Sequence, residues 1–152
     1  MKTSISSAEK PINILLVEDN KGDAELASEA LREATMFNKL FIVYDGEEAM
    51  NFLHHRKGFE NVPRPDIVIL DLNLPKKDGR EVLEELKADD SLKLIPVVIL
   101  TTSMNEDDIS MSYSLHANCF ISKPLDYNRF LDVVKQIENF WMSVVTLPKE
   151  KK

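Results

Sequence analysis

Short runs of consecutive apolar residues recur along the chain. Four are clear and a fifth is weaker: Ile12–Val17, Leu40–Tyr44, Ile67–Leu70, Val97–Leu100 and Cys119–Ile121. Each run is continuous, rich in β-branched residues and bounded by polar residues. This pattern is typical of strands that are buried on both faces, as in a parallel sheet.

The segments between these runs carry apolar residues at helical spacing. The apolar faces are formed by Leu26, Ala30, Leu31 and Ala34; by Ala49, Met50 and Leu53; by Val82, Leu83 and Leu86; and by Phe130, Val134, Ile137 and Trp141. Strand and helix therefore alternate along the chain. With right-handed crossovers, this order predicts an α/β fold, an open doubly wound parallel sheet with helices on both faces. The strand order that we expect is 2-1-3-4-5.

Helix start signals agree with this order. Asn105 precedes three acidic residues, and Asp126 precedes the last helix, as expected for caps at helix N-termini. The fourth helix has the poorest apolar face, formed by Ile109, Tyr113 and Leu115. We expect it to be held least tightly and to be the element that moves.

Length and composition indicate a single globular domain. The chain has 152 residues, of which 43% are hydrophobic, enough for a full core. It contains no apolar run of about 18 residues and no signal peptide, so we expect a cytoplasmic protein with no membrane partner. The formal net charge of −7 and the lack of a basic patch argue against nucleic acid as a partner.

Cysteine and histidine offer no separate site. The single cysteine, Cys119, can complete neither an internal disulfide nor a zinc site, and we expect it to be a small core residue. His54 and His55 are adjacent and would point about 100° apart on a helix. We expect both on the surface.

Polar side chains follow four of the predicted strands. Glu18 and Asp19 follow the first, Asp71 the third, Thr101 the fourth and Lys123 the fifth. Ligands bind at the carboxyl ends of the strands in an open α/β sheet, so we expect these groups to converge at one edge.

Three neighbouring carboxylates repel one another unless one is protonated or a cation binds. Oxygen ligands without nearby His or Cys favour Mg²⁺. Beside such a metal, Asp71 is suited to attack phosphorus, and Lys123 and Thr101 are suited to bind the incoming oxygens. The set indicates phosphoryl transfer.

Four motifs in this order resemble the receiver domain of two-component response regulators: VEDN at 17–20, ILDLNLP at 69–75, LTT at 100–102 and KP at 123–124. The resemblance covers about residues 10–141 and implies a flavodoxin-like (βα)5 fold. IENFWMSVVTLP at 137–148, LTTS at 100–103 and the long loop at 57–65 are similar to stand-alone regulators of the cyanobacterial phytochrome type.

The resemblance implies that Asp71 accepts a phosphoryl group from a sensor histidine kinase, with a phytochrome as a candidate. It implies that Asp19 and Asp71 bind Mg²⁺ directly, that Glu18 contributes largely through water, and that Asn73 offers its backbone carbonyl. Asn73 and Ser103, which flank the site, would tune the lifetime of the acyl phosphate. Such a protein is a signalling phosphoacceptor that catalyses its own phosphorylation and dephosphorylation, not a conventional enzyme.

The resemblance also implies a conformational switch. Thr101 and Lys123 would bind phosphoryl oxygens, and Phe120 would fill the space that Thr101 vacates, altering a protein-interaction surface on the fourth helix, fifth strand and fifth helix. Because Phe120 lacks the hydroxyl of the tyrosine often found at this position, the switch would be one of packing. The bond between Lys123 and Pro124 is expected to be cis.

The expected organisation is an N-terminal tail at 1–9, a receiver domain at 10–141 and a C-terminal extension at 142–152. The chain's end is apolar, with Phe140, Trp141, Val144, Val145 and Leu147. These residues either cover the domain's own core or form a homodimer interface, and the resemblance favours the dimer.

Three other functions share part of this fold or residue pattern. A haloacid-dehalogenase-type phosphatase also uses an Asp nucleophile, but it has a second Asp where this chain has Asn73. A flavodoxin-like flavin carrier needs a phosphate-binding loop after the first strand, where EDNKGD would repel phosphate. A pseudo-receiver, which docks partners without phosphorylation, usually loses part of the acidic set. Because that set is intact here, the pseudo-receiver ranks second.

Overall fold

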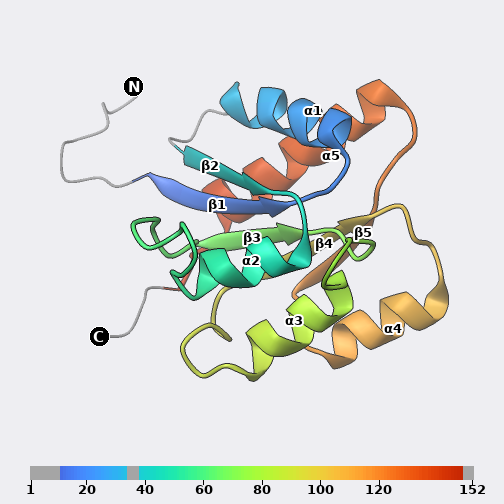
Figure 1. The fold of residues 1–152 in the computed structure, drawn as a ribbon. Coiled ribbons are helices and arrows are strands. Elements are labelled where there is room, and N and C mark those ends of the chain that lie inside the picture. Colours follow the sequence, from blue (N-terminus) through green and yellow to red (C-terminus); the bar gives the residue numbers. More distant parts are fainter. Residues whose placement is uncertain (1–10, 34–37, 149–152) are drawn as a thin grey trace.

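The computed structural model describes residues 11–33 and 38–148, apart from the side chains of residues 142 and 143. Its strands form one parallel sheet in the order β2-β1-β3-β4-β5 (Figure 1). They are β1 (Ile12–Val17), β2 (Asn38–Val43), β3 (Ile67–Leu70), β4 (Val97–Thr101) and β5 (Cys119–Ser122). The predicted doubly wound sheet and its strand order are therefore confirmed.

The helices lie in two layers on either side of this sheet. They are α1 (Lys21–Arg32), α2 (Gly46–Leu53), α3 (Gly79–Ala88), α4 (Glu106–Ser114) and α5 (Tyr127–Glu138), and a π-helical segment, η1 (Asn139–Val144), directly follows α5. α1 and α5 cover one face, and α2, α3 and α4 lie on the other (Figure 1). Within the described ranges, no helix is long and apolar enough to cross a membrane.

The apolar core is divided by the sheet. Leu15 and Val17 of β1 pack on the side of α2 and α3, whereas Ile14 and Leu16 pack on the side of α1 and α5. Successive side chains of a strand point to opposite faces, so a strand covered by helices on both sides needs apolar residues at consecutive positions. This requirement explains the continuous apolar runs in the sequence.

Two strands do not meet the expectation of burial on both faces. β2 and β5 are the outer strands of the sheet, and their side chains are mostly half-buried. For the same reason Cys119, at the start of β5, is half-buried against the core and is not a fully buried core residue. Burial of an outer strand depends on its place in the sheet, which its apolar composition does not reveal.

The predicted helix starts are confirmed, with small shifts in the helical faces. The side chains of Asn105 and Asp126 accept backbone N–H bonds from the first turns of α4 and α5. On α1 the buried face consists of alanines and Leu31, and Leu26 is only partly buried. His54 and His55 are exposed, as expected. Ala34, the predicted tail at 1–9 and the last four residues lie outside the described residues.

Gly79, the first residue of α3, lies directly against the segment that follows β3. Its backbone N–H donates to the Leu72 carbonyl at 2.9 Å. A Cβ at Gly79 would collide with the Asp71 carbonyl oxygen and lie 2.6 Å from the Leu72 Cα. A side chain at this position would therefore displace the segment that carries Asp71.

We expect Gly79→Ala to lower the free energy of unfolding by about 3 kcal/mol, because overpacking against backbone cannot be relieved by a rotamer change. Gly22→Ala is the matched control, since its Cβ would lie 3.2 Å from the end of the exposed Asn20 side chain. It should change the stability by less than about 1 kcal/mol. Urea unfolding of the two variants measures both values, and equal losses would contradict the close approach at Gly79.

Candidate functional site

The sheet register brings the predicted site residues to one edge. Val17 of β1 pairs with Leu70 of β3, so the residues that follow, Glu18 and Asp71, leave the two strands side by side. The Asp71 N–H also donates to the Val17 carbonyl at 3.1 Å. Each strand that carries a predicted site residue therefore presents it at the carboxyl end, as the sequence indicated.

Three carboxylates gather at this edge. One oxygen each from Glu18, Asp19 and Asp71 lie within 4.8 Å of one another. Glu18 and Asp71 are buried, and Asp19 is exposed, so the cluster is open to solvent on one side. Hard oxygen donors in a partly open site fit Mg²⁺, which usually keeps several waters. The chemistry of the donor set thus agrees with the predicted metal.

The Lys123 ammonium lies among these acidic groups. Its Nζ donates to Glu18 Oε1 at 2.7 Å, to Asp23 Oδ2 at 2.9 Å and to Asp71 Oδ2 at 3.2 Å. Only 4% of the Lys123 side chain is exposed, so the interaction is poorly screened by water. All three N–H donors of the ammonium are used within the site.

The pKa values of the site follow from burial and this ion cluster. Burial raises the pKa of Glu18 to about 7, although its hydrogen bond to Lys123 acts in the opposite direction. Burial alone would lower the pKa of Lys123, but its bonds to Glu18 and Asp23 hold it well above its ordinary value. The ammonium therefore stays charged, and Glu18 takes up a proton more readily than an ordinary glutamate does.

Asp23 was missed by the sequence analysis. It lies in the first turn of α1, where its backbone N–H donates to the N-cap side chain of Asn20 at 2.9 Å. This turn directly follows β1, so an acidic residue there reaches the same edge as Glu18. The sequence did carry a signal for Asp23. This acidic residue stands three positions after Asn20, which caps the helix that follows β1, and acidic residues are favoured in the first turn of a helix.

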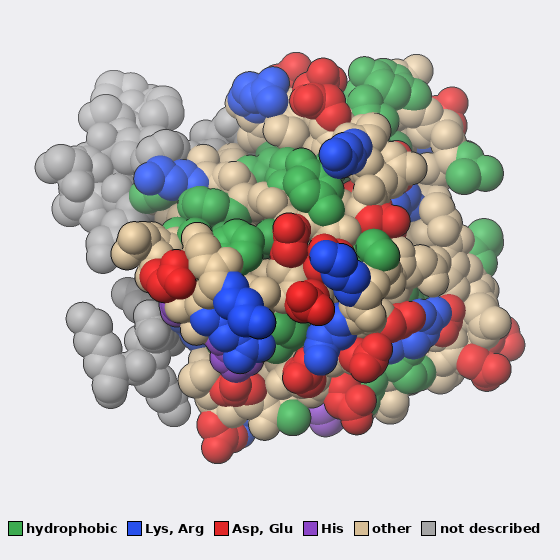
Figure 2. All heavy atoms as spheres, in the orientation of Figure 1, with side chains coloured by type: hydrophobic (Ala, Val, Ile, Leu, Met, Phe, Trp, Pro, Cys, Tyr) green, Lys and Arg blue, Asp and Glu red, His purple; other side chains and the backbone are tan. Residues whose placement is uncertain are grey.

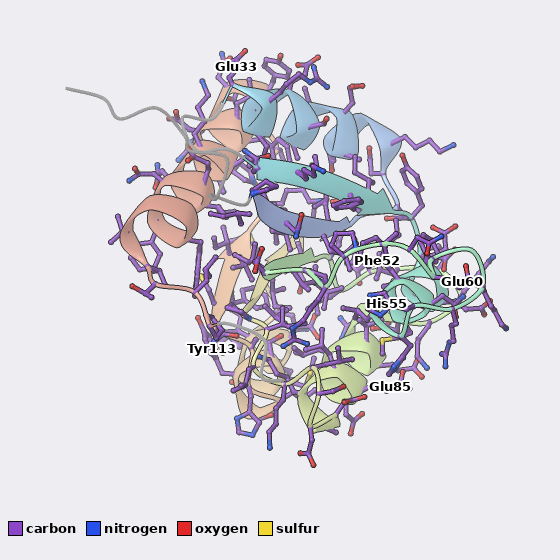
Figure 3. All side chains as sticks on the ribbon, turned by 90° about the vertical axis from the view of Figure 1, so that its left-hand side faces the viewer. Glu33, Phe52, His55, Glu60, Glu85 and Tyr113 are labelled. Atoms are coloured by element: carbon purple, nitrogen blue, oxygen red, sulfur yellow. The ribbon has the colours of Figure 1, made fainter. Side chains whose placement is uncertain are left out.

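Thr101 and Phe120 lie on the neighbouring strands β4 and β5. Thr101, the last residue of β4, is completely buried, and its Oγ1 accepts a long hydrogen bond of 3.5 Å from the Ser103 N–H. Phe120 of β5 is half-buried against the core on the α2 and α3 side. Its backbone N–H donates to the hydroxyl of Tyr113 on α4 at 3.1 Å, and Tyr113 is labelled in Figure 3.

Asn73 and Ser103 flank the site. Asn73 is exposed, and its backbone N–H donates to Asp71 Oδ1 at 3.1 Å. The Ser103 hydroxyl donates to Asp108 Oδ2 at 2.7 Å. Metal binding by the Asn73 carbonyl and the effect of both residues on the acyl phosphate stay predictions.

The expectation of a cis bond before Pro124 was wrong, because the described peptide bonds are all trans. Lys123 makes its three ionic hydrogen bonds from this trans arrangement. The trans isomer is the intrinsically preferred form of a bond to proline, and the contacts of Lys123 do not require the other.

Comparisons with known proteins agree with the fold and the site. The family model described as the response regulator receiver domain matches residues 14–135. Response regulator Rcp1 of Synechocystis sp. is 52% identical over 138 residues, which cover 91% of this chain and 94% of the relative.

Two solved structures are similarly close. The crystal structure of the phosphorylated cyanobacterial phytochrome response regulator RcpA has a TM-score of 0.90 and 52% identity, over 92% of this chain and all (100%) of that one. The Mn²⁺-bound form of response regulator Rcp1 has a TM-score of 0.89 and 52% identity, over 91% and 100%. The chain therefore belongs to the response regulator receiver domain family, signalling proteins of two-component systems.

Proposed function

We propose that this protein is a single-domain response regulator of the cytoplasm whose Asp71 accepts a phosphoryl group from a sensor histidine kinase. The observation that carries the proposal is the environment of Asp71. Its carboxylate is buried, two further carboxylates have oxygens within 4.8 Å, and the Lys123 ammonium lies 3.2 Å away. This arrangement combines a nucleophile, a cation site and a fixed positive charge.

The proposed Mg²⁺ ligands are Glu18, Asp19, Asp71 and the backbone carbonyl of Asn73. A bound Mg²⁺ would neutralise charge on the phosphoryl oxygens. The Mn²⁺-bound form of Rcp1 supports a divalent cation at this edge.

In the proposed reaction, a carboxylate oxygen of Asp71 forms a bond to phosphorus as the phosphorus–nitrogen bond of the phosphohistidine breaks. The bonding electron pair leaves on the imidazole nitrogen, which takes up a proton. The protein's own contribution is positioning and electrostatics, since phosphoryl transfer needs little other covalent help. The Asn73 N–H and Lys123 bind different oxygens of Asp71 and so orient its carboxylate.

Lys123 must exchange a partner when it binds a phosphoryl oxygen, because its three N–H donors are already in use. We propose that Asp23 is the partner released. Its side chain is 27% exposed, compared with 4% for Glu18 and 7% for Asp71. Water can therefore replace the lost ammonium bond at Asp23 at the lowest cost.

The proposed switch links Thr101 to the surface formed by α4, β5 and α5. A phosphoryl oxygen would attract the Thr101 hydroxyl, whose present hydrogen bond to Ser103 is long at 3.5 Å. Phe120, half-buried on the adjacent strand, would then pack into the space left. Because RcpA is a phytochrome response regulator, we propose a phytochrome as a candidate kinase.

We further propose that the protein forms a homodimer through the extension after α5. Trp141 is half-buried against the core, which agrees with a covering role. Phe140 and Val144, however, are 52% and 64% exposed. Exposed apolar residues beyond a finished core commonly mark association.

Phosphorylation is tested by incubating the wild type and Asp71→Asn with Mg²⁺ and acetyl phosphate and measuring intact mass. We expect one phosphoryl adduct on the wild type, none on Asp71→Asn and none after EDTA treatment, because the reaction needs both nucleophile and cation. Asp66→Asn is the matched control, since Asp66 lies just before β3, at the opposite end of that strand, and should not affect the adduct. A wild type that gains no adduct, even with beryllofluoride as an alternative probe, would favour the pseudo-receiver function.

Lys123→Met tests the charge balance of the unphosphorylated site. We expect a loss of about 3–5 kcal/mol in unfolding free energy at about pH 8, because two buried carboxylates lose their cation. The Glu18 pKa of about 7 lies above its ordinary 4.5, so protonation of Glu18 stabilises the fold below pH 4.5, and this contribution is lost as the pH rises through 7. At about pH 5 the Glu18 carboxyl is protonated and no longer needs a cation. The variant should therefore lose less stability at about pH 5 than at about pH 8.

Urea unfolding at the two pH values measures this effect. Lys135→Met is the control, since Lys135 is 54% exposed and makes a long ion pair of 3.8 Å with the exposed Glu33 carboxylate. This variant should lose less than about 1 kcal/mol of unfolding free energy at either pH. A pH-independent loss in Lys123→Met would contradict the proposed role of the ammonium.

The dimer is tested by sedimentation velocity of the wild type and the double variant Phe140→Ser, Val144→Ser. We expect the wild type to sediment as a dimer and the variant as a monomer, because the exposed apolar contact is lost. Leu94→Ser, at a residue that is 45% exposed and precedes β4 in the chain, should leave the dimer intact. A monomeric wild type at the same concentration would show that the extension only covers its own domain.

A further inference from the structure

α4 is held to the rest of the domain by few apolar contacts. Ser112 is its one buried side chain, and the Ser112 hydroxyl has no hydrogen-bond partner within the described part of the chain. An unpaired buried hydroxyl is unfavourable, so packing does not explain why α4 occupies its present position. Other interactions must position the helix.

One such interaction is a bidentate ion pair between α3 and α4. Arg80 Nε donates to Asp108 Oδ1 at 3.0 Å, and Arg80 Nη2 donates to Asp108 Oδ2 at 2.8 Å. The side chains are only 31% and 20% exposed. Two parallel bonds between a guanidinium and a carboxylate fix orientation as well as distance. The neighbouring positions of α3 and α4 are visible in Figure 1.

The guanidinium is itself held in place from α3. Arg80 Nη1 lies 3.0 Å from Oδ1 and 3.1 Å from Oδ2 of Asp78, the residue that caps α3. Hydrogen bonding to Asp108 raises the pKa of Arg80, and hydrogen bonds from Arg80 and Ser103 lower the pKa of Asp108. The pair is therefore fully charged near neutral pH.

The same carboxylate reaches the proposed switch. Asp108 Oδ2, which accepts from Arg80, also accepts from the Ser103 hydroxyl at 2.7 Å. The Ser103 N–H in turn is the group that bonds Thr101 Oγ1. A continuous chain of polar contacts thus runs from α3, through α4, to Thr101 at the carboxyl end of β4.

We propose that Arg80 is a positioning residue that, through Asp108 and Ser103, holds α4 and the β4–α4 loop in the unphosphorylated arrangement. This inference rests on the proposed phosphorylation of Asp71. Movement of the Thr101 hydroxyl toward a phosphoryl oxygen pulls on a loop whose Ser103 side chain is tied to Asp108. Loss of the Arg80 contact therefore lowers the free-energy cost of the rearrangement. It shifts the population toward the conformation that the phosphorylated protein adopts.

The first measurement is amide hydrogen exchange of the full chain without any phosphodonor. We expect exchange in α4 and at residues 102–105 to be about fivefold faster in Arg80→Ala, as for a partly buried bidentate ion pair. Arg80→Lys should be intermediate, since an ammonium cannot make two parallel bonds. Lys77→Ala, which breaks the 2.6 Å ion pair between Lys77 and Glu85 of α3, should leave α4 unchanged.

The second measurement is the rate at which acetyl phosphate with Mg²⁺ forms the adduct. We expect an increase of about fivefold in Arg80→Ala, a smaller one in Arg80→Lys and none in Lys77→Ala, in line with the shift in population. A loss of structure would slow the reaction, so the increase separates positioning from damage. Asp108→Asn should have the same effect as Arg80→Ala, because each removes the ion pair between Arg80 and Asp108. The double variant should therefore show no larger effect than either single variant.

The outcomes are distinct. Unchanged exchange of α4 in Arg80→Ala and Asp108→Asn overturns the inference, and so does faster exchange with a wild-type or slower rate of adduct formation. A wild type that gains no adduct overturns the proposed function, and with it the regulatory role of Arg80. In that case the exchange data still show whether Arg80 holds α4, so the two failures are distinguished.

Discussion

The buried ammonium of Lys123 allows several carboxylates to lie together at the carboxyl edge of the sheet. Without a cation, Glu18 and Asp71 would be two buried negative charges in a poorly solvated site. Lys123 compensates them directly, and α1 supplies Asp23 as a third, more exposed partner. The strands end at this edge, and their order places β1 and β3 together at the centre. The fold and the charge balance therefore depend on each other.

α4 is attached to the domain by forces different from those that hold the other helices. α1 and α5 pack on the sheet through a continuous apolar cluster that includes Leu31, Phe130 and Val134. α4 instead relies on the ion pair of Arg80 with Asp108 and on the bond between Tyr113 and the backbone of Phe120. Apolar burial is insensitive to orientation and difficult to reverse, whereas a few directed polar contacts can be exchanged. This difference makes α4 suited to move while the rest of the domain stays fixed.

On the face shown in Figure 2, acidic and basic side chains are intermixed, and the whole chain carries a formal net charge of −7. The sheet brings Asp71 next to the adjacent residues Glu18 and Asp19, which lie far from it in the sequence. Similarity to Rcp1 and RcpA extends over more than nine-tenths of the chain, so the fold and the sequence indicate the same family.

The sequence by itself determined the parallel sheet and most of the residues at its carboxyl edge, and the resemblance to a known family supported the expected strand order. Parallel strands must be apolar where helices cover them, and the residue after each apolar run must lie at the edge, so Glu18, Asp71 and Lys123 were predictable from local patterns. Tertiary structure alone decided that Asp23 joins Lys123 and that Arg80 pairs with Asp108. These two contacts join residues 100 and 28 positions apart. Such contacts depend on how whole helices dock against one another, and no local pattern of hydrophobic and polar residues encodes that geometry.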